Sequence, residues 1–144
     1  MSASAGVVTL VGVSDQPLDV AAHEGSVAAA AAGAVVSFCG VVRDQDHGRA
    51  VVELEYQAHP SAGDVLDALA RRYSELPDVL ALAVSHRVGT LAVGDVALVA
   101  VVATAHRSEA FAICAQLVDE VKATLPIWKR QVFADGSDEW VNCP

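Results

Sequence analysis

The sequence predicts an α+β fold with a largely antiparallel sheet and flanking helices. Six segments rich in Val and other apolar residues have the length of strands and are bounded by Gly, Asp or Pro. Two further segments place apolar residues at helical spacing, each between a serine that can cap a helix and a proline that ends it. No repeat or linker divides the 144 residues, so we expect a single domain over 1–144.

The N-terminal part is predicted to begin with a strand at VVTLVGV, residues 7–13. Residues 17–32 are expected to form a loop that includes a short Ala-rich helix. Gly33 follows the alanines and is expected to close this helix, because glycine readily adopts the left-handed conformation found after helix ends.

Two strands at 34–42 and 50–57 enclose the polar segment RDQDHGR, whose Asp and Gly residues favour a turn. We therefore expect these two strands to pair as an antiparallel hairpin. Apolar and polar side chains alternate along the second strand, which predicts one buried side and one solvent-facing side. The expected buried side consists of Val52, Leu54 and Tyr56.

The second half of the chain is predicted to contain two long helices and three strands. Ser61 can cap a helix that runs to about Glu75. Strands at 78–89 and 95–105 follow, joined by the loop GTLAVG, and the second is apolar on both sides, as expected near the centre of a sheet.

The last predicted helix runs from about Glu109 to Thr124. Ser108 is expected to cap it, and Pro126 ends it because proline cannot continue the backbone hydrogen bonds. A final strand is predicted at 127–134.

Composition excludes several classes of protein. A net charge of −9 argues against nucleic acid or an anionic membrane as partner, and the apolar runs are too short to span a bilayer. The N-terminus lacks the pattern of a signal peptide, and three cysteines form no paired framework, so we expect a cytoplasmic protein. No nucleotide-binding glycine motif and no metal-ligand spacing among His and Cys is present, so no metal is expected.

The positive charge is concentrated in one segment. Residues 106–130 contain four Lys or Arg against three Asp or Glu, whereas the remaining residues contain five against fifteen. Both lysines of the protein, Lys122 and Lys129, lie in this segment. A small anion is therefore least repelled here.

Lys122 lies at the edge of the apolar side of the last predicted helix. Its position is consistent with a lysine whose stem covers the core while its ammonium reaches water. The alternative is an ammonium at the rim of a pocket, where partial desolvation favours proton transfer or covalent chemistry. The predicted apolar stripe consists of Phe111, Cys114, Val118, Val121 and Leu125.

Three further basic positions are candidates for anion binding. Lys129 shares a face of the last strand with Ile127 and Gln131, where a lysine can either protect a sheet edge or reach a site. His106 and Arg107 precede a helix, and free N–H groups at a helix start bind anions, although both residues could instead stabilise the loop. Arg43 opens the RDQDHGR segment, a position typical of a solvated turn residue, and is the third candidate for anion binding.

Taken together, these stretches resemble the family of molybdopterin synthase catalytic (large) subunits. The resemblance covers roughly residues 34–141 in order, while the first 33 residues match only loosely. It is carried by four stretches: FCGVVRDQDHGRAVVELEYQAHP, SHRVGTLAVGD, VVATAHRSEAF, and VKATLPIWKRQ followed by DGSDEW.

The resemblance implies an α/β hammerhead fold and a homodimer that binds two small ubiquitin-like sulfur-carrier subunits, giving a heterotetramer. The implied reaction transfers sulfur from a thiocarboxylate at the C-terminal Gly-Gly of the carrier to cyclic pyranopterin monophosphate. The product is the dithiolene of molybdopterin, and no metal or redox cofactor is implied. This chain ends in VNCP rather than Gly-Gly, so we expect it to be the sulfur-accepting enzyme and its carrier to be a separate chain.

By position, the resemblance assigns Lys122 and Lys129 as catalytic residues. It assigns Arg43, His106 and Arg107 to substrate binding. The sequence leaves open which protomer of the dimer supplies these residues to a given site. The chain departs from the family at Gln131, where Glu is frequent, and it stops soon after Trp140, where many relatives continue with a basic tail.

Two other functions stay open from the sequence. A non-catalytic homologue could bind a pterin phosphate or the carrier tail as a scaffold or regulator. A generic anion-binding α+β domain would have no affinity for a carrier that ends in Gly-Gly.

Overall fold

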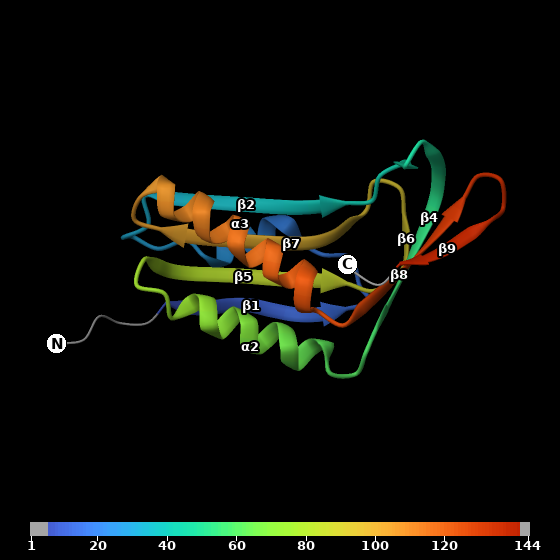
Figure 1. The fold of residues 1–144 in the computed structure, drawn as a ribbon. Coiled ribbons are helices and arrows are strands. Elements are labelled where there is room, and N and C mark those ends of the chain that lie inside the picture. Colours follow the sequence, from blue (N-terminus) through green and yellow to red (C-terminus); the bar gives the residue numbers. More distant parts are fainter. Residues whose placement is uncertain (1–5, 142–144) are drawn as a thin grey trace.

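The computed structural model describes residues 6–141 and confirms an α+β fold with largely antiparallel sheets (Figure 1). The predicted strands and the two long helices are present, with bounds within a few residues of those expected. The elements are β1 (Val7–Ser14), α1 (Val20–Ser26), β2 (Ala34–Val41), β3 (Gln45–Asp46), β4 (Arg49–Ala58), α2 (Ala62–Ser74), β5 (Val79–Arg87), β6 (Gly89–Ala92), β7 (Val96–Thr104), α3 (Arg107–Thr124), β8 (Ile127–Phe133) and β9 (Asp138–Val141).

The first sheet has the strand order β1-β5-β7-β2. β1 pairs with β5 in parallel, and the other neighbours are antiparallel. Helices α2 and α3 cover one face of this sheet, while α1 packs against the other face (Figure 1). β5 and β7 are therefore buried on both faces, which explains why residues 79–84 of β5 and residues 96–103 of β7 are continuously apolar in the sequence.

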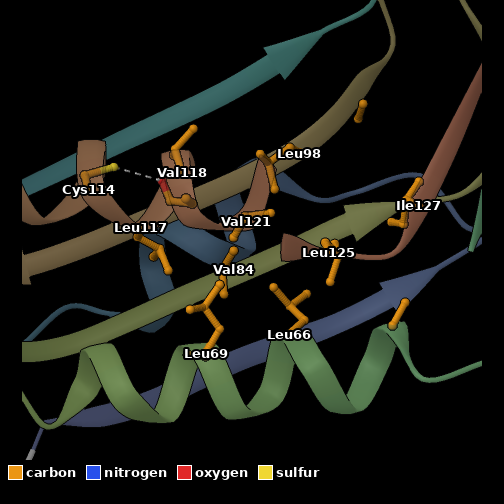
Figure 2. Close-up of a cluster of buried hydrophobic side chains, with 14 of the residues drawn as sticks. Leu66, Leu69, Val84, Leu98, Cys114, Leu117, Val118, Val121, Leu125 and Ile127 are labelled. Carbon is orange, nitrogen blue, oxygen red and sulfur yellow. Dashed lines mark hydrogen bonds between the residues drawn. The ribbon is translucent and has the colours of Figure 1, made fainter. Parts of the chain in front are cut away.

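The main core fills the space between the first sheet and the two long helices (Figure 2). Leu66 of α2, Leu117 of α3 and Val84 of β5 are fully buried and belong to this one cluster. Each such side chain contributes about 1.5–3 kcal/mol through removal from water. This packing fixes the C-terminal end of α3, and with it Lys122, against the sheet.

The second face of the sheet is joined to α1 by a buried polar contact. The Ser85 hydroxyl lies 2.7 Å from Nε2 of His23, and Nδ1 of the same ring lies 2.6 Å from the carbonyl oxygen of Asp19. Because the carbonyl can only accept, Nδ1–H donates to it and Nε2 accepts from the hydroxyl. Each polar group in this buried cluster is satisfied, which is why His23 and Ser85 can lie in the interior.

The second sheet lies crosswise at one end of the first, in the order β3-β4-β8-β9, with β6 also paired to β4 (Figure 1). Here the predicted hairpin between 34–42 and 50–57 is wrong: β2 pairs with β7, and β4 pairs with β8. The RDQDHGR segment does form a hairpin, but a local one between β3 and β4. His47 and Gly48 have φ of 48° and 79°, as a type I′ turn requires. These two residues form the turn, and the rest of the RDQDHGR segment does not connect β2 to β4 as a hairpin.

The predicted Ala-rich helix is also wrong in its position. α1 begins after Asp19, whose carboxylate accepts a hydrogen bond from the N–H of Ala22, and ends before the alanines. The exposed run at 28–32 is too short to form a helix on propensity alone. Gly33 does not close a helix; a Cβ there would lie 2.4 Å from the carbonyl oxygen of Ala105, so glycine is needed for this close approach.

Three side chains differ from their predicted burial. Val52 is exposed and Val51 is buried instead, because the register of β4 shifts between Val51 and Glu53, while Leu54 and Tyr56 are buried as expected. Phe111 is 62% exposed on α3 rather than part of the core. Cys39, expected to be a packing residue, is exposed on β2, whereas Cys114 is buried as predicted.

Between residues 6 and 141, no helix has the length and apolar content needed to cross a bilayer. Within the same range, no group of three or more His, Cys, Asp or Glu side chains is placed to hold a metal ion. Cys143, to which the sequence assigned no role, lies outside the described residues.

Candidate active site

A cavity of about 200 Å³ lies where the two sheets meet the end of α3. Three of the five predicted site residues, Arg43, Lys122 and Lys129, line it. They come from the segment after β2, from the last turn of α3 and from β8, so the fold brings Arg43 together with two lysines that lie 79 and 86 positions further along the chain. The wall between them is formed by the ends of β2, β5 and β7 and by the middle of β4.

Lys129 reaches the cavity because of the alternation of β8. Ile127, Gln131 and Phe133 on the same side of the strand are buried, and Lys129 is half-buried between them, as the sequence predicted. Lys129 also pairs with Tyr56 of β4, another residue of the cavity wall. The strand therefore holds the stem of the lysine against apolar neighbours while its ammonium faces the cavity.

Lys122 lies in the last turn of α3, next to the fully buried Val121. Its own side chain is exposed, yet it lines the cavity, which places it at the rim of the apolar side of the helix. The C-terminal end of a helix carries partial negative charge, so an ammonium is electrostatically favoured here.

The charged residues that line the cavity are all cationic. Arg43 is largely exposed and lies 3.7 Å from the Asp46 carboxylate, which is not part of the lining. No Asp or Glu contributes to the wall among the described residues. A cavity with two ammonium groups and one guanidinium, in a chain of net charge −9, is suited to an anionic ligand.

Three buried polar side chains at the cavity were not recognised as site residues from the sequence. Tyr56, His86 and Gln131 are 8%, 1% and 4% exposed, respectively, and all three line the cavity. His86 and Gln131 could have been predicted as site residues from their residue type. Each is a polar residue on the inward side of a strand whose other inward residues are apolar. Such a residue has to be satisfied by a partner or a ligand.

His86 is neutral at physiological pH. Burial lowers its pKa to about 4, against the opposing effect of a hydrogen bond from Nδ1 to the carbonyl oxygen of Arg87 at 2.7 Å, and the positive charge of Lys122 lowers the pKa further. The ring of Tyr56 meets the His86 ring edge-on at 79°, with 5.0 Å between their centroids. The imidazole is thus fixed in its plane and in its tautomer.

The lowered pKa of His86 predicts a pH dependence of stability. The unfolded chain takes up a proton near pH 6.5, whereas the folded chain does so only near pH 4. The free energy of unfolding should therefore fall by about 3 kcal/mol as the pH drops from 6.5 to 4, in addition to the effect of the carboxylates. Urea unfolding of wild type and His86→Phe at pH 7 and pH 4 measures this difference, and an equal pH dependence in both proteins would contradict it.

His106 and Arg107 do not lie at this cavity. They line a separate open hollow with Gly33, Ala105 and Ser108, at the N-terminal end of α3. Fifteen residues of helix separate Arg107 from Lys122, which corresponds to about 22 Å along the helix axis. Within one chain, therefore, the five predicted residues form two separate sites.

The start of α3 differs from the prediction as well. The helix begins at Arg107 with His106 as its N-cap, rather than being capped by Ser108. The side chain of His106 makes no capping hydrogen bond, and the first N–H groups of a helix have no acceptor within the helix itself. Both basic side chains are exposed there. Two cationic side chains at a helix start are the combination that the sequence analysis considered for an anion, and this role stays a prediction.

Comparison with known proteins relates the chain to one family. The family described as "MoaE protein" matches residues 13–124. A protein of Oryza sativa subsp. indica named molybdopterin synthase catalytic subunit is 40% identical over 120 residues, which is 83% of this chain and 62% of the relative. A protein of the same name from Nostoc sp. is 43% identical over 112 residues, covering 76% of this chain and 68% of the relative.

A solved structure supports the same relationship. The crystal structure of molybdopterin synthase from Staphylococcus aureus matches with a TM-score of 0.84 and 27% identity, over 92% of this chain and 96% of that chain. The chain spans about 62% of the length of the rice relative, so similarity covers only part of that protein.

Proposed function

The chain belongs to the MoaE protein family, and we propose that it is the catalytic subunit of a molybdopterin synthase, a cytoplasmic sulfurtransferase of molybdenum cofactor biosynthesis. The observation that carries this proposal is the cavity that is lined by both lysines of the protein together with Arg43 and, among residues 6–141, by no acidic side chain. The substrates expected for such an enzyme, a phosphorylated pterin and a thiocarboxylate, are both anions, and the cavity is cationic in an otherwise acidic protein.

In this proposal the sulfur comes from a small ubiquitin-like carrier whose C-terminal Gly-Gly ends in a thiocarboxylate. The carrier tail enters the cavity beside Lys122, and its sulfur attacks a side-chain carbon of cyclic pyranopterin monophosphate, where a C–S bond forms as a C–O bond to that carbon breaks. Water then cleaves the bond between the sulfur and the acyl carbon of the carrier, which leaves the sulfur on the pterin and an ordinary carboxylate on the carrier. Lys122 transfers protons during this attack, and Lys129 stabilises the negative charge that develops on the acceptor. Two such transfers give the dithiolene.

We further propose that His106 and Arg107 complete the site of a second copy of the chain. β2 is an edge strand of the first sheet, and its two ends lie near the two half-sites. Its first residue, Ala34, pairs with Thr104, which leads directly into His106 and Arg107. Its last residue, Val41, belongs to the cavity wall and leads into Arg43. If the β2 strands of two copies pair antiparallel about a two-fold axis, each His106–Arg107 pair approaches the cavity of the other copy.

The surface around β2 is suited to such pairing. Val35 and Val41 are 47% and 48% exposed on β2, and Phe111 of the adjoining α3 is 62% exposed. An edge strand with free backbone groups and exposed apolar side chains invites pairing with another chain. The homodimer expected for this family gives these residues a partner.

The proposed function is tested by reconstitution. The purified chain is combined with a thiocarboxylated carrier protein and cyclic pyranopterin monophosphate, and molybdopterin is followed as its oxidised fluorescent derivative. We expect product in proportion to the chain, with a carrier that ends in an ordinary carboxylate as the control. Tight binding of the carrier without any product would instead favour the scaffold or regulator function, and no affinity for the carrier would favour a generic anion-binding domain.

A further inference from the structure

Arg43 lies in the segment that joins the two sheets. The regular pairing of β2 with β7 ends at Val41, and the carbonyl oxygen of Asp44 already accepts a hydrogen bond at 2.8 Å from the N–H of Val51 in the second sheet. The side chain of Arg43 is 77% exposed, and an ion pair of such an exposed group, here with Asp46, does little to hold it in place. The position of Arg43 at the cavity therefore depends on how the backbone of this segment is held.

Two hydrogen bonds attach the residue before Arg43 to the turn between β6 and β7. The N–H of Val42 donates to the carbonyl oxygen of Asp95, and the N–H of Gly94 donates to the carbonyl oxygen of Val42, each at 2.9 Å. Val42 is also buried in the main core. The position of this turn therefore sets the position of the backbone that leads into Arg43.

The side chain of Asp95 closes the β6–β7 turn. Its Oδ2 accepts a hydrogen bond from the N–H of Ala92 at 2.9 Å, and its own backbone N–H donates to the carbonyl oxygen of Ala92 at 3.0 Å. Gly94 has a φ of 93° within the turn, a conformation that favours glycine. The shape of the turn is thus held by two hydrogen bonds between Ala92 and Asp95, one of which needs the carboxylate.

Arg87 attaches the same carboxylate to the end of β5. Its Nη1 lies 3.4 Å from Oδ2 of Asp95, and its side chain is only 16% exposed. Among residues 6–141, Asp95 is the only carboxylate paired with this guanidinium. A largely buried guanidinium needs such a partner, because removing one member of a buried pair leaves the other charge uncompensated. Asp95 thus connects the β6–β7 turn to the strand that carries His86 of the cavity wall.

We propose that Asp95 is a positioning residue for Arg43. Among the described residues, the cavity lining includes neither Asp95 nor Arg87, so Asp95 acts through the turn rather than by touching a ligand. Its carboxylate keeps the turn closed, the turn holds Val42, and the guanidinium of Arg43 is thereby presented to an anion in the cavity. This inference rests on the proposed function for the identity of that anion as a pterin phosphate.

The first test measures the KM for cyclic pyranopterin monophosphate at saturating thiocarboxylated carrier. Asp95→Ala should raise this KM by about tenfold, as for one lost hydrogen bond to a charged group, and should leave kcat within about twofold. Asp95→Asn is the matched control, because its amide oxygen still accepts from the N–H of Ala92, and its KM should stay within about twofold of wild type. An Asn variant as impaired as the Ala variant, or a loss confined to kcat, would overturn the inference.

A double-mutant cycle connects the effect to Arg43. Arg43→Ala alone should raise the same KM by about tenfold or more. Adding Asp95→Ala should then cause no further rise, because the group that Asp95 positions is already absent. An unchanged KM in Arg43→Ala would overturn the inference. So would effects that multiply in the double variant, since a general loss of structure acts independently of Arg43.

Hydrogen exchange tests the structural step without any substrate. In Asp95→Ala the N–H of Val42 should exchange about tenfold faster than in wild type. The N–H of Val51, which donates to Asp44 on the other side of Arg43, is the internal control and should change by less than about twofold. Should Asp95→Ala not fold, Arg87→Met/Asp95→Ala also removes the uncompensated guanidinium, and the same results are expected.

The outcomes separate this inference from the proposed function. Unchanged exchange at Val42, with normal formation of product by wild type, would overturn the positioning role and leave the enzyme function intact. Absence of product from wild type, with faster exchange confined to Val42 in the variant, would overturn the proposed function and leave Asp95 as the residue that positions Arg43.

Discussion

Replacing Lys122 by Ala is expected to lower the rate of molybdopterin formation by about 10²–10⁴-fold, the range for loss of a residue that transfers protons in the transition state. Lys122 lies at the rim of the cavity in the last turn of α3, and the neutral His86 and the more deeply placed Lys129 are not positioned to replace an ammonium at the rim. The measurement is single-turnover formation of product with saturating thiocarboxylated carrier.

The fold should not change in this variant. The Lys122 side chain is exposed, and the neighbouring Val121 and Leu125 hold the helix end in the core without it. We expect the free energy of unfolding to change by no more than about 0.5 kcal/mol. Lys122→Arg is the matched control, because it keeps the positive charge but cannot readily give up a proton. It should retain binding of the carrier and lose most of the turnover.

Near-normal turnover in Lys122→Ala would remove Lys122 from the mechanism and leave Lys129 as the candidate. Full activity in Lys122→Arg, with loss only in the Ala variant, would show that charge and not proton transfer is what the position supplies.

The sequence was sufficient to predict the elements whose pattern is set by burial. β7 is apolar on both faces because helices cover both faces of its sheet, and the inward side of β8 could be identified from alternation alone. The pairing of strands was less predictable. The turn residues His47 and Gly48 produce a hairpin, but only the structure shows that it joins β4 to the two-residue strand β3 rather than to β2. Local turn chemistry specifies a turn and not the length of the strands it joins.

The candidate site was predictable only in part, for a related reason. Arg43, Lys122 and Lys129 stand out because cations are few in an acidic chain. His86 and Gln131 stand out less, because the local pattern marks them only as polar residues on inward sides of strands, whereas their position at the meeting point of two sheets depends on strand pairing. The distance between Arg107 and Lys122 did follow from the predicted helix, because the two residues lie at its opposite ends, and a rise of about 1.5 Å per residue keeps them apart within one chain.

That separation leads to the second prediction of large effect, a rescue between two inactive variants. Lys122→Ala damages the cavity, and Arg107→Ala damages the hollow at the other end of α3. If each working site combines the cavity of one copy with the hollow of the other, a mixed dimer of these two variants contains one fully intact site and one site with both defects. We expect the mixed dimer to have about half the activity of the wild-type dimer, while each variant alone is nearly inactive.

The experiment requires mixed dimers free of the parent species. The two variants are co-expressed with different affinity tags, and the dimers that carry both tags are isolated by two successive purification steps. The matched control is the mixed dimer of Lys122→Ala with Lys129→Ala, whose defects lie in the same cavity, so that neither of its sites is intact and no rescue is expected. Rescue in the first mixture and not in the second requires a site shared between copies. Failure in both would mean that Arg107 serves the cavity of its own chain, or none, and would overturn the antiparallel β2 pairing from which the shared site follows.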